Sequence, residues 1–98
     1  MTDEEIKERI SQRRRQMLVH SILYYRFHSN IIPDHKWAEW ARELVALQAK
    51  YPKIAEQAPL AEAFKDFDAS TGYDLPLRDP HYVAVAKWLL EYHERRNS

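Results

Sequence analysis

The segment from Tyr24 to Pro52 constrains the fold of this chain more than any other part of its sequence. From residue 37 onward, large apolar side chains recur at the spacing i, i+3, i+4, i+7, which is the period of one face of an α-helix. Pro52 has no amide hydrogen for a continuing helix, so the pattern predicts a helix from about Asp34 to Tyr51. Asp34 is suited to accept a hydrogen bond from amides of the first turn. The repeating residues are Trp37, Trp40, Ala41, Leu44, Leu47 and Tyr51.

Another amphipathic run precedes this segment. Thr2 and Glu5 have the spacing of a capping box, in which a hydroxyl and a carboxylate each accept a hydrogen bond from a free amide at a helix start. A first helix is therefore predicted from there to about Phe27, with charged residues opposite its apolar face. That face consists of Ile6, Ile10, Met17, Leu18, Ile22, Tyr24 and Tyr25.

The pattern after Pro52 predicts one or two short helices, followed by a long loop over residues 68–80 that holds the only Gly. Asp79 and Pro80 then form a cap and first-turn pair for a final helix that runs to His93. Strand-like alternation is absent from the sequence. We therefore expect an all-α fold, a small bundle of three main helices, in which residues 1–98 make a single domain.

Composition excludes several classes of function. The 98 residues include no Cys, which removes thiol catalysis and thiolate metal sites, and 15 basic residues balance 15 acidic ones. A general electrostatic attraction to nucleic acid is therefore not expected. No apolar run approaches the roughly 20 residues that span a bilayer, and the start of the chain is too polar for a signal peptide. We expect a cytoplasmic protein with no membrane association.

Motifs for metal binding and catalysis are also missing. The five His residues are dispersed, without the His-Glu-x-x-His spacing of zinc enzymes. The run Asp66–Asp74 begins like a calcium loop, but its Gly stands at the seventh place and Leu77 occupies the twelfth, where a bidentate Glu is required. A Gly-x-Ser-x-Gly nucleophile elbow does not occur. The sequence thus predicts no metal site and no catalytic residue.

Three consecutive arginines, Arg13, Arg14 and Arg15, are the candidate contacts for nucleic-acid phosphates. Consecutive residues spread around a helix instead of forming one stripe, and acidic residues lie nearby in the sequence. A solvated helix surface is the interpretation that the neutral net charge favours over phosphate binding.

The aromatic pair Tyr24 and Tyr25, at the end of one predicted helix, precedes Asp34 and Trp37 at the start of the next. The whole run resembles, without a gap, the small N-terminal Ia domain of bacterial NAD-dependent DNA ligases, and the stand-alone phage and prophage proteins related to them. The residues that carry this resemblance are Tyr24-Tyr25, Ile32-Pro33-Asp34, Trp37, Glu43-Leu44, Leu47 and Tyr51-Pro52.

In the ligases this domain is a helical module that holds the nicotinamide mononucleotide (NMN) half of NAD, with aromatics on the nicotinamide and carboxylates on the ribose. The resemblance implies that Tyr24, Tyr25, Asp34 and Trp37 are the corresponding ligand contacts. Ala38 stands where the family has an Asp. Losing that carboxylate costs about 1.5–3 kcal/mol in a buried site, so we expect affinity to fall by roughly one to two powers of ten.

The resemblance leaves several hypotheses open. Ligation needs the family's Lys-x-Asp-Gly motif, which this sequence lacks, so no enzyme activity is expected. One hypothesis is a non-catalytic phage or prophage accessory protein in a bacterial host, which binds a protein partner through Trp40 or Trp88. In that case Asp34 caps its helix, and the aromatics fill the core or an interface between the first two helices. The alternative is a module that binds NMN or NAD, as a sensor or in trans with an adenylating enzyme. Nucleic-acid binding is a third hypothesis.

Overall fold

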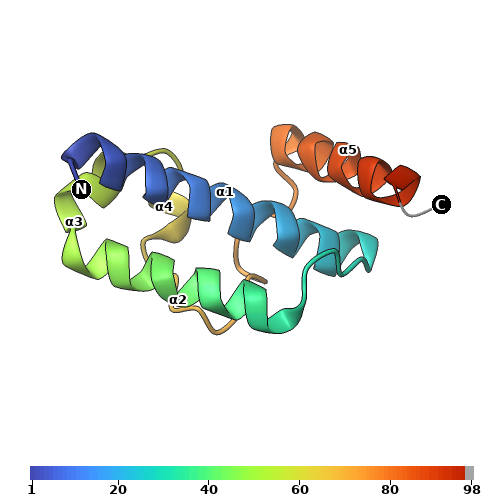
Figure 1. The fold of residues 1–98 in the computed structure, drawn as a ribbon, viewed down its shortest axis with the longest axis horizontal. Coiled ribbons are helices and arrows are strands. Elements are labelled where there is room, and N and C mark those ends of the chain that lie inside the picture. Colours follow the sequence, from blue (N-terminus) through green and yellow to red (C-terminus); the bar gives the residue numbers. More distant parts are fainter. Residues whose placement is uncertain (97–98) are drawn as a thin grey trace.

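The protein is described here by a computed structural model, which defines residues 1–96. Five helices follow one another along the chain: α1 (Asp3–Phe27), α2 (Asp34–Lys50), α3 (Pro52–Gln57), α4 (Ala61–Phe64) and α5 (Pro80–Arg96). Residues 1–96 contain no β-strand. The predicted all-α fold is therefore confirmed, with three long helices, two short ones and a long loop before α5 (Figure 1).

Helix α1 begins and ends where the sequence predicts. The Glu5 amide donates to the Thr2 hydroxyl and the Thr2 amide donates to the Glu5 carboxylate, each at 3.2 Å, so the capping box is present. At the other end His28 adopts the left-handed conformation, with φ at 51°, and its amide donates to the Leu23 carbonyl. This cap stops the helix at Phe27 and turns the chain toward α2.

The start of α2 differs from the prediction in one respect. The capping position belongs to Pro33, whose carbonyl accepts from the amides of Lys36 at 3.0 Å and Trp37 at 3.2 Å. Asp34 is already inside the helix and makes no capping hydrogen bond, so its predicted role as the cap is wrong. A capping side chain belongs to the residue just before the helix, from which it accepts a hydrogen bond from amides of the first turn. Asp34 is the first helical residue, so its side chain starts one residue too late to do this. Its carboxylate is left for other contacts.

The rest of the chain follows the predicted order. Helix α2 ends at Lys50, and Pro52 occupies the first turn of α3, where its missing amide hydrogen costs nothing. Residues 65–79 form the loop, so it begins slightly earlier than predicted. The Asp79 carboxylate then accepts from the amides of His81 at 3.0 Å and Tyr82 at 3.4 Å, which confirms it as the cap of α5.

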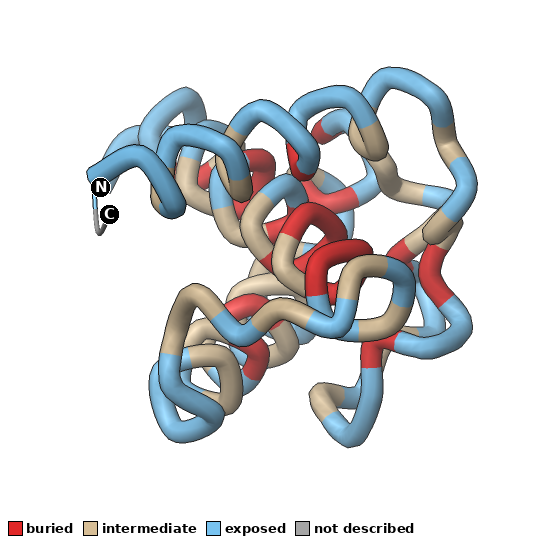
Figure 2. The backbone as a smooth tube through the Cα atoms, turned by 90° about the vertical axis from the view of Figure 1, so that its right-hand side faces the viewer, coloured by how far each residue is buried: buried red, intermediate tan, exposed pale blue. Residues whose placement is uncertain are grey.

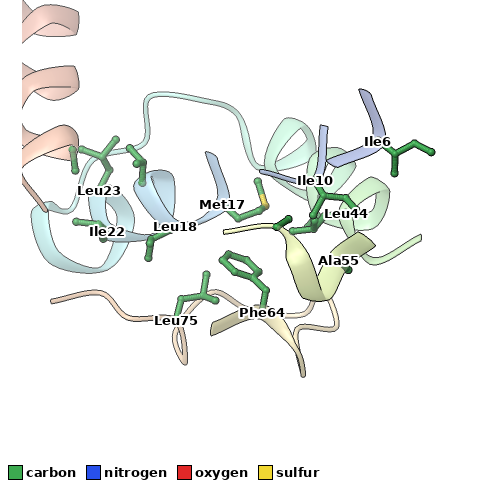
Figure 3. Close-up of a cluster of buried hydrophobic side chains, with 14 residues drawn as sticks. Ile6, Ile10, Met17, Leu18, Ile22, Leu23, Leu44, Ala55, Phe64 and Leu75 are labelled. Carbon is green, nitrogen blue, oxygen red and sulfur yellow. The ribbon is translucent and has the colours of Figure 1, made fainter. Parts of the chain in front are cut away.

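Helix α1 lies at the centre of the fold. It packs against α2 and α3 on one side and against α5 on another, so α2 and α5 flank it (Figure 1). Buried residues gather where these elements meet, and the outer faces are exposed (Figure 2). The side chain of Phe64, from the short helix α4, points toward Met17 of α1 and lies near Leu44 of α2 (Figure 3). The largest fully buried apolar side chains are Ile10, Met17, Leu18, Ile22, Leu23, Leu44 and Phe64.

The apolar face predicted for α1 divides into two parts. Ile6, Ile10, Met17, Leu18 and Ile22 are buried, which confirms them as core residues. Tyr24 and Tyr25, by contrast, leave the core, since the Tyr24 side chain is 54% exposed and Tyr25 is only half-buried. Within residues 1–96, no helix combines the length and apolar character needed to cross a membrane.

Candidate functional site

A pocket of about 220 Å³ lies beside the turn that joins α1 to α2. This turn is at the right-hand end of the α1–α2 pair in Figure 1. One wall comes from the last two turns of α1, the second from the α1–α2 turn and the start of α2, and the third from loop residues 70–72. All four residues that the sequence singled out as ligand contacts line this pocket. The complete lining is His20, Ser21, Tyr24, Tyr25, Asn30, Ile32, Asp34, Trp37, Ser70, Thr71 and Gly72.

The aromatic residues of the pocket are held by edge-to-face contacts. The Tyr24 and Tyr25 rings are perpendicular, with centroids 4.9 Å apart. Trp37 is half-buried and meets Phe67 at 6.2 Å, which anchors one edge of the indole against the core. A T-shaped pair leaves ring faces free for a third ring, and the exposure of Tyr24 shows that part of its surface is available. The expectation that these aromatics fill the core is therefore wrong for Tyr24.

Asp34 brings the negative charge of the pocket. Its carboxylate has no hydrogen bond or ion pair within residues 1–96, because Pro33 occupies the capping position. A free carboxylate beside aromatic faces can accept from hydroxyl groups of a ligand and attract a positively charged ring. Asp34 is thus an exposed carboxylate at the edge of the pocket.

His20 is a lining residue that the sequence did not single out. Burial lowers its pKa below the usual value, so the imidazole is neutral at pH 7. Its ring lies 5.9 Å from the ring of Trp40. No Lys or Arg occurs among the lining residues of the described chain, and the pocket therefore carries only the charge of Asp34.

Ser21 is a second residue that sequence reasoning missed. It is 2% exposed, and its hydroxyl is the buried side-chain polar atom without a hydrogen-bond partner within residues 1–96. Gly72 lies directly against it, since a Cβ at position 72 would collide with the Ser21 oxygen. The lone Gly of the chain was the available signal, but nothing in the sequence tells which residue it approaches.

Ala38, the position where the family's Asp is replaced, is half-buried in α2. It is not part of the pocket lining formed by residues 1–96. The pocket consequently has one carboxylate from the start of α2, not two.

The three arginines do not share a surface. Arg13 pairs with Glu43 and lies over the Trp40 ring at 5.1 Å, whereas Arg15 is exposed and lies 3.8 Å from Glu8. Arg14 is 2% exposed, and the expectation of a solvated side chain is wrong for it. No common phosphate-binding face results from this arrangement.

Arg14 instead joins three segments of the fold. Its Nε donates to the Gln48 side chain at 2.9 Å, and its Nη1 donates to the carbonyls of Ala58 at 3.2 Å and Pro59 at 2.9 Å. Burial without an acidic partner lowers its pKa from the usual value. The position was not predictable from a run of three like residues, because the helix phase that buries one of them depends on tertiary packing.

Comparison with known proteins identifies the family. The family described as "DNA ligase-like, N-terminal NAD+-binding domain" matches residues 3–59, which is more than half of the chain. Searches against curated proteins and against solved structures give no significant match. The match covers α1, the turn and α2, the elements that carry Tyr24, Tyr25, Asp34 and Trp37. The chain therefore belongs to the family of DNA ligase-like N-terminal NAD+-binding domains.

Proposed function

We propose that this protein binds the nicotinamide mononucleotide half of NAD+ in the pocket between α1, α2 and the loop. The observation that carries the proposal is the convergence of Tyr24, Tyr25, Asp34 and Trp37 on one pocket. Two of them come from the last turn of α1 and two from the first turn of α2. Family membership supports the same ligand, since the family's own description names NAD+.

The chemistry of the pocket fits an oxidised nicotinamide. Its pyridinium ring is a cation, which tyrosine and tryptophan faces attract by about 0.5–2 kcal/mol. The Asp34 carboxylate complements that charge and can accept hydrogen bonds from the ribose hydroxyls. A neutral His20 adds no competing positive charge. The site therefore favours a positively charged aromatic ring linked to a hydroxyl-bearing sugar.

The size of the pocket indicates which part of the dinucleotide is enclosed. Pockets that enclose drug-sized ligands measure about 300–1,000 Å³. At about 220 Å³, this one encloses a fragment such as the nicotinamide and its ribose. No basic side chain lines it, so the phosphate and any adenosine half point toward solvent.

Binding is proposed here without ligation chemistry. The 98 residues contain no Lys-x-Asp-Gly motif, the source of the lysine nucleophile in the ligases. A sensor of NMN or NAD+, or a module acting in trans with an adenylating enzyme, is the function consistent with a binding pocket and no nucleophile.

Calorimetric titration of NMN tests the proposal. Asp34→Asn and Tyr24→Ala are expected to weaken binding at least tenfold without lowering the melting temperature appreciably, because both side chains are exposed. Glu39→Gln is the matched control, since Glu39 is an exposed acid on the same helix, outside the pocket. Equal affinity in all four proteins would refute the assignment of these residues.

A protein-binding function is the second candidate, and one observation favours it. Trp88 is 58% exposed on α5 and stacks against Tyr92 with centroids 5.5 Å apart and an interplanar angle of 12°. An exposed, paired tryptophan is typical of an interface anchor. Trp40 offers less surface, because it is half-buried beneath Arg13.

This candidate keeps the earlier hypothesis of a phage-type accessory protein. Trp88→Ala should abolish capture of a partner without changing stability, and Trp40→Ala should change stability first. Partner capture that survives Trp88→Ala would exclude the α5 face as the interface.

A further inference from the structure

The third wall of the pocket comes from a part of the chain that the family match does not cover. The match ends at residue 59, whereas Ser70, Thr71 and Gly72 line the pocket opposite α1 and α2. The four family-type contacts therefore share the pocket with residues that lie outside the family match. The contacts of these three residues with α1 show how this wall is held in place.

Gly72 fixes how close the wall stands to α1. A Cβ at this position would collide with Ser21 Oγ and lie 2.8 Å from Ser21 Cβ, closer than real contacts of this kind. Its φ is not in the left-handed region, so the need for glycine here is one of space alone. The Ser21 hydroxyl beneath it is buried and has no hydrogen-bond partner within residues 1–96, and Ser21 is one of the residues that line the pocket.

Thr71 and Tyr73 hold the Tyr25 ring. The Tyr25 hydroxyl and the Thr71 hydroxyl share a hydrogen bond of 2.8 Å, and the Tyr73 amide donates to the same Thr71 oxygen at 3.1 Å. The ring of Tyr73 meets that of Tyr25 at 5.4 Å and 78°. Tyr25 is half-buried and could otherwise change rotamer. These contacts hold its side chain at the hydroxyl and at the ring.

We propose that residues 70–73 complete the nicotinamide site, with Thr71 as a positioning residue that holds Tyr25 in the orientation that binds the ligand. The inference rests on the proposed function of the pocket. It adds to the binding site a segment that lies outside the family match. It also attributes part of the affinity for NMN to Thr71, which contacts Tyr25 and lines the pocket. Fixing the ring before binding lowers the entropy lost on binding, which raises affinity.

A pair of substitutions at one position tests this proposal with NMN as the probe. Thr71→Val keeps the shape of the side chain and removes the hydroxyl, and Thr71→Ser keeps the hydroxyl. NMN affinity should fall about fivefold in Thr71→Val, as expected for one lost neutral hydrogen bond, and recover in Thr71→Ser. Arg78→Ala is the control, because Arg78 is exposed in the same loop and outside the pocket lining.

Gly72→Ala provides an independent variant. The added methyl must push the wall away from Ser21, so NMN affinity is expected to fall tenfold or more. If this variant does not fold, the Thr71 pair alone decides. If the wild-type protein binds NMN and Thr71→Val binds it with the same affinity, the inference about Thr71 is overturned and the proposed function still holds. Wild-type protein that binds no NMN overturns both.

Discussion

Arg14 offers a prediction whose magnitude follows from the structure. Replacing it by Met keeps an unbranched apolar stem, shortens the side chain by the guanidinium end and removes three donated hydrogen bonds, to Gln48, Ala58 and Pro59. Each lost bond is worth about 1 kcal/mol, so Arg14→Met should lower the free energy of unfolding by about 3 kcal/mol. Relief of a buried charge offsets a part of this loss.

The neighbouring arginine supplies the control. Arg15→Met is the same substitution one residue along the same helix, but Arg15 is exposed and its contact with Glu8 is 3.8 Å long. It should change the free energy of unfolding by less than about 0.5 kcal/mol. For a domain of this size, 1 kcal/mol shifts the melting temperature by about 4–8 °C, so the full loss of about 3 kcal/mol corresponds to about 12–24 °C, and the charge offset places the expected fall for Arg14→Met below that range's upper end.

Thermal unfolding followed by circular dichroism at 222 nm measures both variants. The reasoning is refuted if Arg14→Met and Arg15→Met melt within a few degrees of each other. Such a result would mean that the guanidinium is not engaged by the carbonyls of Ala58 and Pro59 in solution. Arg14→Lys should lie between wild type and Arg14→Met, because one ammonium cannot reach all three acceptors as a planar guanidinium does.

Two further predictions concern His20 and the charge of the ligand. Because burial lowers the pKa of His20, the imidazole binds a proton more tightly in the unfolded chain than in the folded one. The stability contributed by burying the neutral imidazole is therefore complete above about pH 6.5, and it is lost as the pH falls through the lowered pKa. Chemical denaturation at pH 7.5 and pH 5 should therefore show a smaller loss of stability in His20→Gln than in wild type, and equal losses would contradict the burial. Oxidised NMN should bind about tenfold more tightly than its reduced, uncharged-ring form in calorimetric competition, and similar affinities would show that Asp34 and the aromatic faces do not select a cation.

The helices were predictable because their signals are local. Thr2 with Glu5, and Asp79 before Pro80, set helix starts by contacts within three residues, and all of these hydrogen bonds are present. Asp34 was misassigned as a cap because the sequence does not distinguish it from Pro33, one position earlier. That error hid the reason why its carboxylate is free.

The pocket was predictable only in part. Tyr24, Tyr25, Asp34 and Trp37 lie close together in the sequence and face one another once the two helices form a hairpin. The third wall depends on Gly72 meeting Ser21 across about fifty residues, and no helical period reports such a contact. Loop conformation without regular hydrogen bonding is decided by tertiary packing, which a single sequence does not encode in a readable pattern.

The central claim is that the pocket binds NMN, and calorimetric titration of NMN into the wild-type protein tests it most directly. The proposed site lacks the family's carboxylate at Ala38, but Tyr24, Tyr25, Asp34 and Trp37 all line the pocket. The account predicts saturable heat with a Kd of roughly 1–100 μM, which corresponds to about 5.5–8 kcal/mol, and an affinity at least tenfold weaker in Asp34→Asn. No heat at millimolar NMN would contradict it.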